Sequence, residues 1–456
     1  MPSTAAVEGR LPRGLTGYRT HINHEERAMS IQRAIQVDEK VPLLQAIPLS
    51  FQHLFAMFGA SVLVPTLFNI DPAVVLFMNG IGTLIYLLLC KGKAPAFLGS
   101  SFAFLSPVFV VLGANKELWG ANYSYALGGF IASGAIFSIV ALIIWRYGSA
   151  WLRVVLPPAT MGPIVMLIGL ELAGVAAGMA GIMPGKDGAY DAKAITVAVV
   201  TLLVVTFGSV LFRGFLAVVP VLVGIAAGYV TAIFMGMVNF GGVAAAPVLA
   251  APTFYTPKFD INAILVIIPA ALVVISEHIG HLVVTGNIVG RDLTVDPGLH
   301  RSLLGDGLST MLSGTVGSVP TTTYGENIGV MAITRVYSVW VIGGAALLSI
   351  CLAFIGKLSA LIQSIPVPVM GGICLLLFGV IAASGVRMLV ESKVDYSKPM
   401  NLSLTAIVLI VGISGTAVHL GQVQLKGMAL ATVVGMLLSL VFYLLGRLGL
   451  IDTTRQ

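Results

Sequence analysis

Two glutamates and a histidine lie within long apolar stretches of a chain that otherwise keeps its charges at the edges of such stretches: Glu277, His281 and Glu326. An ionisable group at bilayer depth is costly, so it normally faces the protein interior and marks a substrate or proton site. Burial favours the neutral forms of carboxyl and imidazole groups, which permits proton exchange near neutrality. The residue types therefore predict a buried binding site that also handles protons.

The spacing of these residues limits what such a site could hold. Glu277 and His281 are four residues apart and share one face of a helix. Ionised carboxylates only accept hydrogen bonds, whereas the free amides of a broken helix donate them. This combination suits a small, flat, neutral molecule with both N–H and C=O groups. Our hypothesis is that Glu277 with His281 carries a coupling proton and that Glu326 holds the substrate.

Each of these residues also has a structural interpretation. Glu277 could make a helix–helix hydrogen bond, His281 could be a satisfied core histidine, and Glu326 could cap the helix that follows it. Two further acidic residues at membrane depth, Glu171 and Asp306, are interpreted as gating or structural groups.

The composition indicates a polytopic membrane protein. Apolar residues make up 57% of the 456 residues and charged residues 10%, far below the quarter or so that is usual in soluble domains. Apolar runs near the roughly 20 residues that cross a bilayer recur along the chain. They predict fourteen spans: 47–69, 72–90, 97–114, 124–145, 156–179, 194–212, 216–236, 261–286, 302–318, 321–334, 337–355, 359–386, 402–418 and 427–446.

The basic residues predict the orientation of these spans. Residues 1–40 mix both charge signs and predict a polar tail rather than a signal peptide. With this tail in the cytoplasm, 19 of the 25 basic residues lie on the cytoplasmic side, as the positive-inside rule prefers. We expect an inner-membrane protein with both termini cytoplasmic. The net charge of +6 follows from this topology and does not indicate nucleic-acid binding.

The two halves of the chain resemble each other. The Ile-Pro and Gly pattern of Ile47–Gly59 returns in Ile268–Gly280, shifted by 221 residues, and that of Pro157–Gly162 returns in Pro366–Gly371, shifted by 209. Both shifts fit a repeat of seven spans, although chance agreement of Pro and Gly remains an alternative. Because seven is odd, the second copy would be inverted, an arrangement that places transporter sites near the membrane midplane.

The third span of each expected repeat is too polar for a plain helix. Residues 99–107 and 320–327 are rich in Ser, Thr and aromatic residues, which favours a short extended segment followed by a half-helix. The free N–H groups at such a break need a partner, and a ligand can supply it. The Phe102 ring could pack on that ligand or in the core. His53, in the first span, is interpreted as a structural hydrogen-bonding partner.

No pattern indicates an enzyme, a metal site or a cofactor. Cys90, Cys351 and Cys374 lie in apolar runs without disulfide or metal-ligand spacing. In Glu277–His281 the two histidines are three residues apart with the glutamate outside them, which does not match a zinc-protease motif. No nucleophile–base pair is evident.

The segment Glu326–Arg335, together with Gln52-His53, resembles the signature of the nucleobase-ascorbate transporter family, the nucleobase:cation symporters. The resemblance extends from about Pro42 to Gly446. It implies fourteen spans in two inverted repeats, with homodimers formed through a gate domain. The implied divisions are a cytoplasmic tail (1–41), a core domain (42–148 and 259–356), a gate domain (149–258 and 357–448) and a second tail (449–456).

The resemblance also implies roles for individual residues. Glu277 and Glu326 would bind a pyrimidine ring, and His281 would contribute hydrogen bonding and proton coupling. The remaining pocket would consist of the backbone at Phe102 and Gly325, which contacts the ring carbonyls, with Ala60 alongside and Tyr324 as lining.

The residue at position 326 implies the substrate. Relatives that carry xanthine or urate tend to have Gln where this chain has Glu326, so the resemblance implies import of uracil with protons, without a cofactor. Another nucleobase remains an alternative. An anion such as sulfate or bicarbonate, carried by transporters of the same implied fold, is disfavoured because Glu326 would repel it.

Overall fold

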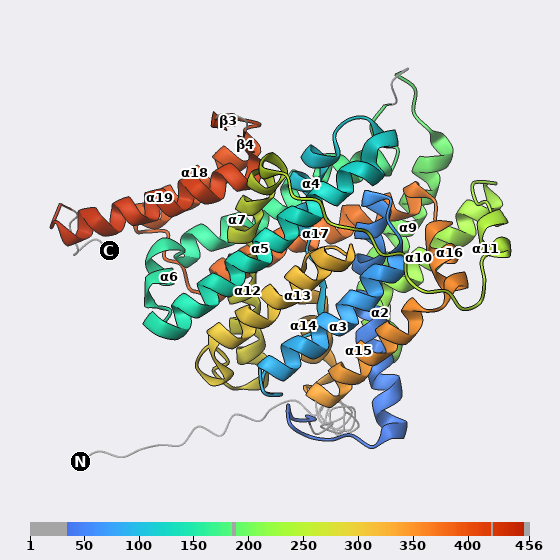
Figure 1. Cartoon of the computed structure of the whole chain (residues 1–456), viewed down its shortest axis with the longest axis horizontal. Helices are drawn as coiled ribbons and strands as arrows, with labels where there is room; N and C mark the ends of the chain where they lie inside the picture. Colours follow the sequence, from blue (N-terminus) through green and yellow to red (C-terminus); the bar gives the residue numbers. More distant parts are fainter. Residues whose placement is uncertain (1–33, 185–187, 421–422, 451–456) are drawn as a thin grey trace, which may run out of the picture.

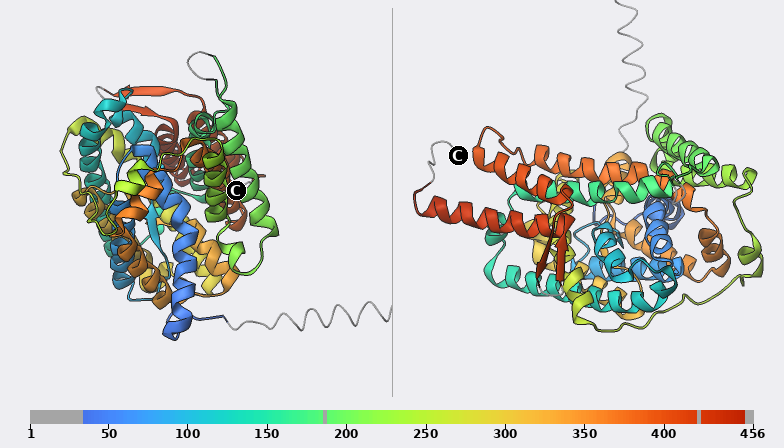
Figure 2. Two further views of the ribbon diagram at one scale, coloured as in Figure 1. Left: turned by 90° about the vertical axis from the view of Figure 1, so that its right-hand side faces the viewer. Right: turned by 90° about the horizontal axis from the view of Figure 1, so that it is seen from above.

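The described part of the chain forms a bundle of helices with two very short antiparallel sheets. A computed structural model describes residues 34–184, 188–420 and 423–450, so most of the predicted N-terminal tail and residues 451–456 lie outside the described part. Figures 1 and 2 show α18 and α19 running together and extending beyond the rest of the bundle at one end. The helices of the first half are α2 (Leu43–Phe68), α3 (Pro72–Leu89), α4 (Leu105–Leu112), α5 (Trp119–Tyr147), α6 (Ala150–Val155), α7 (Pro158–Glu171), α8 (Ala173–Met179), α9 (Ala192–Leu211), α10 (Pro220–Phe234) and α11 (Gly241–Ala245).

The second half also consists mainly of apolar helices connected by short segments. Its helices are α12 (Ile261–Val289), α13 (Leu299–Val316), α14 (Gly325–Thr334), α15 (Val339–Ala353), α16 (Gly356–Gln363), α17 (Val367–Glu391), α18 (Pro399–Ile413) and α19 (Gly427–Arg447). Short 3-10 helices are η1 (Phe102–Phe104), η2 (Lys116–Leu118) and η3 (Gly214–Val218), and a single π-helical turn, η4 (Thr294–Gly298), precedes α13.

Local sequence signals explain where several helices begin. Asp71 caps α3 by accepting a 2.9 Å hydrogen bond from the Ala73 amide, and Asp260 caps α12 in the same way through Ala263. Both α7 and α17 start directly after a proline in extended conformation, Pro157 and Pro366 respectively. The cap signals therefore position α12, which carries two of the candidate site residues.

The extended segments predicted in the third span of each half are present. Strand β1 (Leu98–Ser100) leads through η1 into α4, and β2 (Thr321–Thr323) leads into α14. The strands pair antiparallel, with Gly99 opposite Thr322, and the Tyr324 amide continues the ladder with a 3.0 Å bond to the Phe97 carbonyl. This pair joins parts of the chain that are more than 200 residues apart, and it places the starts of η1 and α14 next to each other.

Eight helices of the described part are long and apolar enough to cross a membrane, judged by length and composition. The number of crossings therefore stays a prediction, whereas a predominantly helical, highly apolar architecture is found. The eight are Leu43–Phe68, Pro72–Leu89, Lys116–Tyr147, Pro158–Met179, Ala192–Leu211, Ile261–Val289, Val367–Glu391 and Gly427–Arg447.

The other predicted spans contain shorter or more polar elements. Four apolar helices have only 10–17 residues, and α13 carries His300, Arg301 and Asp306 within its length. The range 402–418 differs from the expected helix, because α18 ends at Ile413 and the chain turns into a hairpin, β3 (Ala417–Leu420) and β4 (Val423–Lys426). Gly415, with φ near 70°, makes this turn possible, since L residues rarely adopt that conformation.

The segments that resemble each other in sequence share a few local features. Helices α2 and α12 each carry an interior proline near their start, Pro48 and Pro269. Helices α7 and α17 pack against each other, and a Cβ at Gly162 would collide with Leu389. The glycines that recur in the sequence thus allow close helix packing.

Candidate functional site

A cavity of about 310 Å³ lies between α12, the β2–α14 segment and α17. This volume falls at the lower end of the range for small-molecule sites. The wall contains most of the residues predicted from the sequence. The lining residues are Phe102, Val165, Glu277, Gly280, His281, Val284, Thr322, Tyr324, Gly325, Glu326, Ile328, Gly329, Val380, Ile381, Ser384, Arg387 and Met388.

Glu277 and His281 lie one turn apart on α12 and both line the cavity, as their spacing predicts. The Glu277 Oε2 atom is buried and has no hydrogen-bonding partner among the described residues. A buried polar atom without a partner is costly. The described residues therefore do not support the interpretation of Glu277 as a helix–helix hydrogen-bonding residue, and its Oε2 atom still lacks a donor.

His281 is anchored to the broken segment on the other side of the cavity. Its Nδ1 lies 2.7 Å from the Thr323 carbonyl oxygen and 3.2 Å from Thr323 Oγ1. Because a carbonyl only accepts, Nδ1 must carry the proton, and Nε2 of the neutral ring is left as an acceptor. A Cβ at Gly325 would lie 3.4 Å from this Nε2. His281 is thus both a satisfied structural residue and a lining residue with one acceptor at the start of α14.

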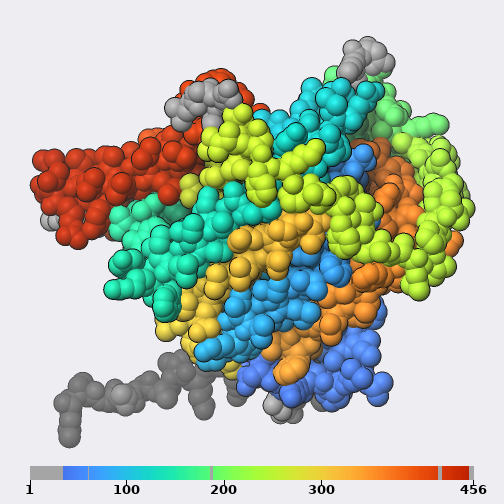
Figure 3. All heavy atoms as spheres, in the orientation of Figure 1, coloured from blue at the N-terminus to red at the C-terminus, as the bar shows by residue number. Residues whose placement is uncertain are grey.

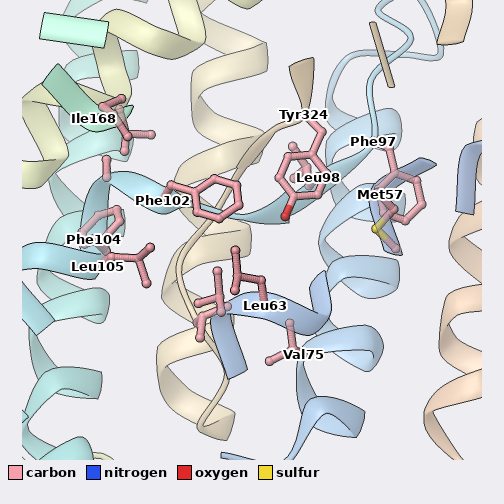
Figure 4. Close-up of a cluster of buried hydrophobic side chains, with 14 of the residues drawn as sticks. Met57, Leu63, Val75, Phe97, Leu98, Phe102, Phe104, Leu105, Ile168 and Tyr324 are labelled. Atoms are coloured by element: carbon pink, nitrogen blue, oxygen red, sulfur yellow. The ribbon is translucent and has the colours of Figure 1, made fainter. Parts of the chain in front are cut away.

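Tyr324 and Gly99 hold the two strands together behind the cavity. The Tyr324 hydroxyl donates a 3.2 Å hydrogen bond to the Ser100 carbonyl. Its ring covers Gly99 so closely that a Cβ at that position would overlap it. In Figure 4 this ring lies on one side of Phe102, and Phe104, Leu105 and Ile168 lie on the other. Tyr324 is therefore a lining residue that also fixes the strand pair.

Phe102 lies at the start of η1, lines the cavity and packs against α17. Its ring meets Phe378 of α17 edge-on, with ring centroids 5.9 Å apart. Only 7% of the residue is exposed. The ring thus packs in the core and lines the cavity, whereas its packing on a ligand stays a prediction.

Glu326 and Gly325 occupy the first turn of α14. The first N–H groups of a helix have no partner within it, so they offer donors to a ligand. The Glu326 carboxyl lines the same cavity. The site therefore combines two carboxyl groups, from α12 and α14, with the amides at the start of a half-helix.

Sequence reasoning missed the wall that α17 provides. Ser384, Arg387 and Met388 line the cavity, and Arg387 Nε donates a 2.6 Å hydrogen bond to Glu391. Their spacing of three and four residues puts them on one helix face, which was the available signal. Ala60 is a residue of α2 whose side chain lies outside the described part of the structure, so its place beside the site stays a prediction.

Three other polar contacts hold the surrounding helices together. Asn327 Nδ2 lies 3.0 Å from the His53 carbonyl and 3.2 Å from its Nδ1, which joins α14 to α2. His278 Nδ1 lies 3.2 Å from Asp306, and both side chains are fully buried. Glu171 accepts from the Ser106 hydroxyl at 2.6 Å. These contacts agree with the structural interpretations of His53 and Asp306.

Solved structures with a similar fold are membrane transport proteins. The chain matches the transmembrane domain of a cyanobacterium bicarbonate transporter, BicA, with a TM-score of 0.57 and 14% sequence identity, covering 89% of this chain and 98% of that one. It matches the murine anion transporter Slc26a9 in the inward-facing state with a TM-score of 0.67 and 12% identity, covering 97% of this chain and 77% of the other. At such low identity the match establishes the fold alone.

Sequence comparison gives a closer relationship. Uracil permease of Escherichia coli strain K12 is 60% identical over 414 residues, 91% of this chain and 95% of the relative. The uracil permeases of Paenibacillus larvae and Bacillus subtilis strain 168 are 58% and 46% identical, over 91% and 87% of this chain and 98% and 92% of theirs. A family model described as "Permease family" matches residues 44–421. The chain is therefore an integral membrane protein and belongs to this permease family, the nucleobase transporters that the signature at Glu326–Arg335 resembles.

Proposed function

We propose that this protein imports uracil together with protons across the inner membrane. Relatives at 46–60% identity carry the name uracil permease. The observation that supports the proposal most directly concerns Glu277, which lines a cavity of suitable size and has a buried carboxyl oxygen without a partner among the described residues.

The proposed recognition uses complementary hydrogen bonds. A uracil ring presents N–H donors and carbonyl acceptors in one plane, whereas the cavity offers acceptors on Glu277 and Glu326 and an amide donor at Gly325. Phe102 and Tyr324 supply flat apolar surface at the cavity wall. In this proposal, N–H groups of the ring donate to carboxyl oxygens, and a ring carbonyl oxygen accepts from the backbone amide.

Proton coupling is assigned to Glu277 with His281. The Glu277 carboxyl group can bind and release a proton, and its place in the cavity wall brings this group close to a bound substrate. In the proposal, Glu277 takes up a proton before or with uracil and releases it on the other side. His281, fixed by Thr323, supports this through its acceptor nitrogen near Gly325.

The proposed transport movement places the cavity at a domain boundary. Glu277 and Glu326 belong to the proposed core domain (42–148 and 259–356), and Arg387 belongs to the proposed gate domain (149–258 and 357–448). Movement of one domain against the other exposes the cavity to each side in turn. Fourteen spans in two inverted repeats, a homodimer formed through the gate domain, and cytoplasmic termini complete the proposal. The matching Pro and Gly positions of α7 and α17 support the repeat.

Uptake by purified protein in liposomes tests the proposal. With an inward proton gradient, we expect labelled uracil to accumulate, unlabelled uracil to compete, and xanthine and sulfate to compete weakly or not at all. Accumulation of sulfate would contradict the proposal, since Glu326 would repel an anion. Equal competition by xanthine would change the assigned substrate to another nucleobase.

A further inference from the structure

A second cavity, unconnected with the candidate site, forms an open groove of about 760 Å³ on the outer face of the bundle. Figure 3 shows α3 beside α15 on the surface that faces the viewer, with the start of α2 below them. We name it the α3–α15 groove. Its lining residues are Val41, Leu43, Ala46, Ile47, Ser50, Leu84, Leu87, Leu88, Lys91, Gly92, Val339, Trp340, Gly343, Gly344, Leu347, Leu348 and Cys351.

Two neighbouring glycines create the hollow. A Cβ at Gly344 would collide with Ser50, so this glycine lets α15 approach α2. At Gly343 a Cβ would meet only Leu87, at 3.8 Å, so this position leaves open space in the groove. The Ser50 hydroxyl is already used, since it donates a 2.8 Å hydrogen bond to the Val341 carbonyl. The floor of the groove therefore offers a ligand no free hydroxyl group at Ser50, and its other residues here are apolar.

The rim of the groove is exposed and strongly apolar. Leu43 is 75% exposed, Leu88 is 78% exposed and Leu347 is 55% exposed. Such a surface is stable only against a hydrocarbon environment or an apolar partner. In an integral membrane protein, acyl chains are available all along this face.

One end of the groove differs from the rest because it is basic. Lys91 lies there at the end of α3, and Lys40 is held over the Trp340 ring with its Nζ 4.7 Å from the centroid. Both lysines are exposed. The neighbouring Lys93 has a carboxylate partner, Asp296 at 2.6 Å, whereas the described residues provide no such partner for Lys91. A tryptophan beside lysines is typical of the membrane–water interface.

The length of the groove matches one leaflet. From Trp340 at the basic end to Cys351, α15 advances 11 residues, or roughly 16 Å at 1.5 Å per residue. Half of a hydrocarbon core that is about 30 Å thick is about 15 Å. The groove thus provides basic groups at headgroup level and apolar wall along one acyl chain length.

We propose that the α3–α15 groove binds an anionic diacyl phospholipid, with the phosphate near Lys91 and Lys40 and an acyl chain along Gly343 and Leu347. Charge complementarity at one end distinguishes this occupant from a neutral lipid. The proposal is independent of the transported substrate.

Lipid quenching of a label on Cys351 tests the proposal. Cys351 is exposed, whereas Cys90 and Cys374 are buried, so a bimane maleimide labels it selectively. Labelled protein is placed in two series of liposomes, in which the mole fraction of brominated phosphatidylglycerol or of brominated phosphatidylcholine increases. Basic residues near an anionic headgroup give a roughly tenfold preference, so we expect half-maximal quenching at a roughly tenfold lower fraction of brominated phosphatidylglycerol.

Variants separate the headgroup from the acyl chain. K40Q/K91Q should remove the preference for phosphatidylglycerol but keep quenching by both lipids. Lys116→Gln is the control, since it removes a lysine that is stacked on Trp119 elsewhere, and it should keep the preference. Gly343→Leu should fill the groove and weaken quenching by both. Gly379→Leu, at an exposed helix position with open space around it, should not.

Three results would overturn the proposal. Equal quenching by both lipids in the unaltered protein would mean that the basic end recognises no headgroup. Preference that survives K40Q/K91Q would place recognition elsewhere. Absence of quenching by either lipid would mean that a second copy or another segment covers the groove.

Discussion

At the scale of single residues, neighbouring side chains on α12 serve different purposes. Glu277 lines the cavity and leaves one carboxyl oxygen without a partner among the described residues. His278, the next residue, is fully buried on another face, where it lies 3.0 Å from Ser302 and 3.2 Å from Asp306. Glu277 therefore lines the cavity, whereas His278 joins α12 to α13 through its contact with Ser302.

Glu277→Gln should therefore impair uptake and leave the fold intact. The variant removes the group that binds the proton and leaves a buried substrate donor without its acceptor, which costs about 1–3 kcal/mol, so uracil uptake at low concentration should fall roughly five- to hundredfold. The melting temperature should stay within the error of the measurement, because no hydrogen bond within the protein is lost at Oε2. Glu117→Gln makes the same chemical change in an exposed turn and should leave both quantities unchanged. Full uptake by Glu277→Gln would refute its role.

His278→Ala should have the opposite effect. It removes the 3.0 Å contact between His278 Nε2 and the buried Ser302 hydroxyl, and the loss of a partner by a buried polar group costs about 1–3 kcal/mol. We expect a lower melting temperature in detergent. Unchanged thermal stability would show that the contact between His278 and Ser302 contributes little.

At the scale of elements, the β1–β2 pair fixes the starts of η1 and α14. Gly99 is required because the Tyr324 ring lies where its side chain would be. The Thr83 hydroxyl also accepts from the Leu98 amide at 2.9 Å, which ties β1 to α3. The strand pair thus connects the cavity to the bundle.

Gly99→Ala should disrupt this connection. The added methyl group must displace the Tyr324 ring, and overpacking of this kind costs about 1–3 kcal/mol. We expect reduced uracil uptake together with a lower melting temperature. Gly120→Ala, in α5 with open space around the added Cβ, is the matched control and should be neutral or slightly stabilising. Equal behaviour of the two variants would contradict the packing argument.

The sequence was informative about these elements for identifiable reasons. Ser, Thr and aromatic residues within an apolar span predicted the breaks before α4 and α14. The isolated ionisable residues within apolar spans predicted a buried site that contains Glu277, His281 and Glu326. The α17 wall was not predicted, because Arg387 resembles an ordinary basic residue at the end of a span. The β3–β4 hairpin was also missed, since its apolar residues continue the pattern of α18 beyond Ile413. Such features depend on tertiary contacts that local patterns do not encode.

At the scale of the whole molecule, Glu171 connects parts that the proposed movement must separate. It lies at the end of α7 and accepts from the Ser106 hydroxyl of α4 at 2.6 Å and from the Met428 amide of α19 at 3.0 Å. A Cβ at Gly427 would collide with this carboxylate, so the glycine is needed for its close approach. The contact between Ser106 and Glu171 crosses the proposed boundary between core and gate.

Ser106→Ala should shift the balance between the two conformations of the transporter. A hydrogen bond to a charged group contributes about 1.5–3 kcal/mol, so the conformation with this contact should lose roughly tenfold or more in population. Labelling of Ser384→Cys by an impermeant maleimide, in a Cys351→Ser background, measures this from each side of the membrane. Ser209→Ala, which removes a bond within α9 only, should not change the labelling. The same labelling ratio in Ser106→Ala would show that the contact does not govern the movement.

Proton movement during uracil uptake tests the central claim most directly. Liposomes that contain the protein and an internal pH-sensitive dye receive uracil from outside while labelled uracil is counted in parallel. We predict that the interior acidifies in proportion to the uracil taken up, and that both signals disappear when Glu277 and Glu326 are replaced by glutamine in protein that remains folded. Uracil uptake without acidification, or uptake and acidification that persist in the doubly substituted protein, would contradict the account.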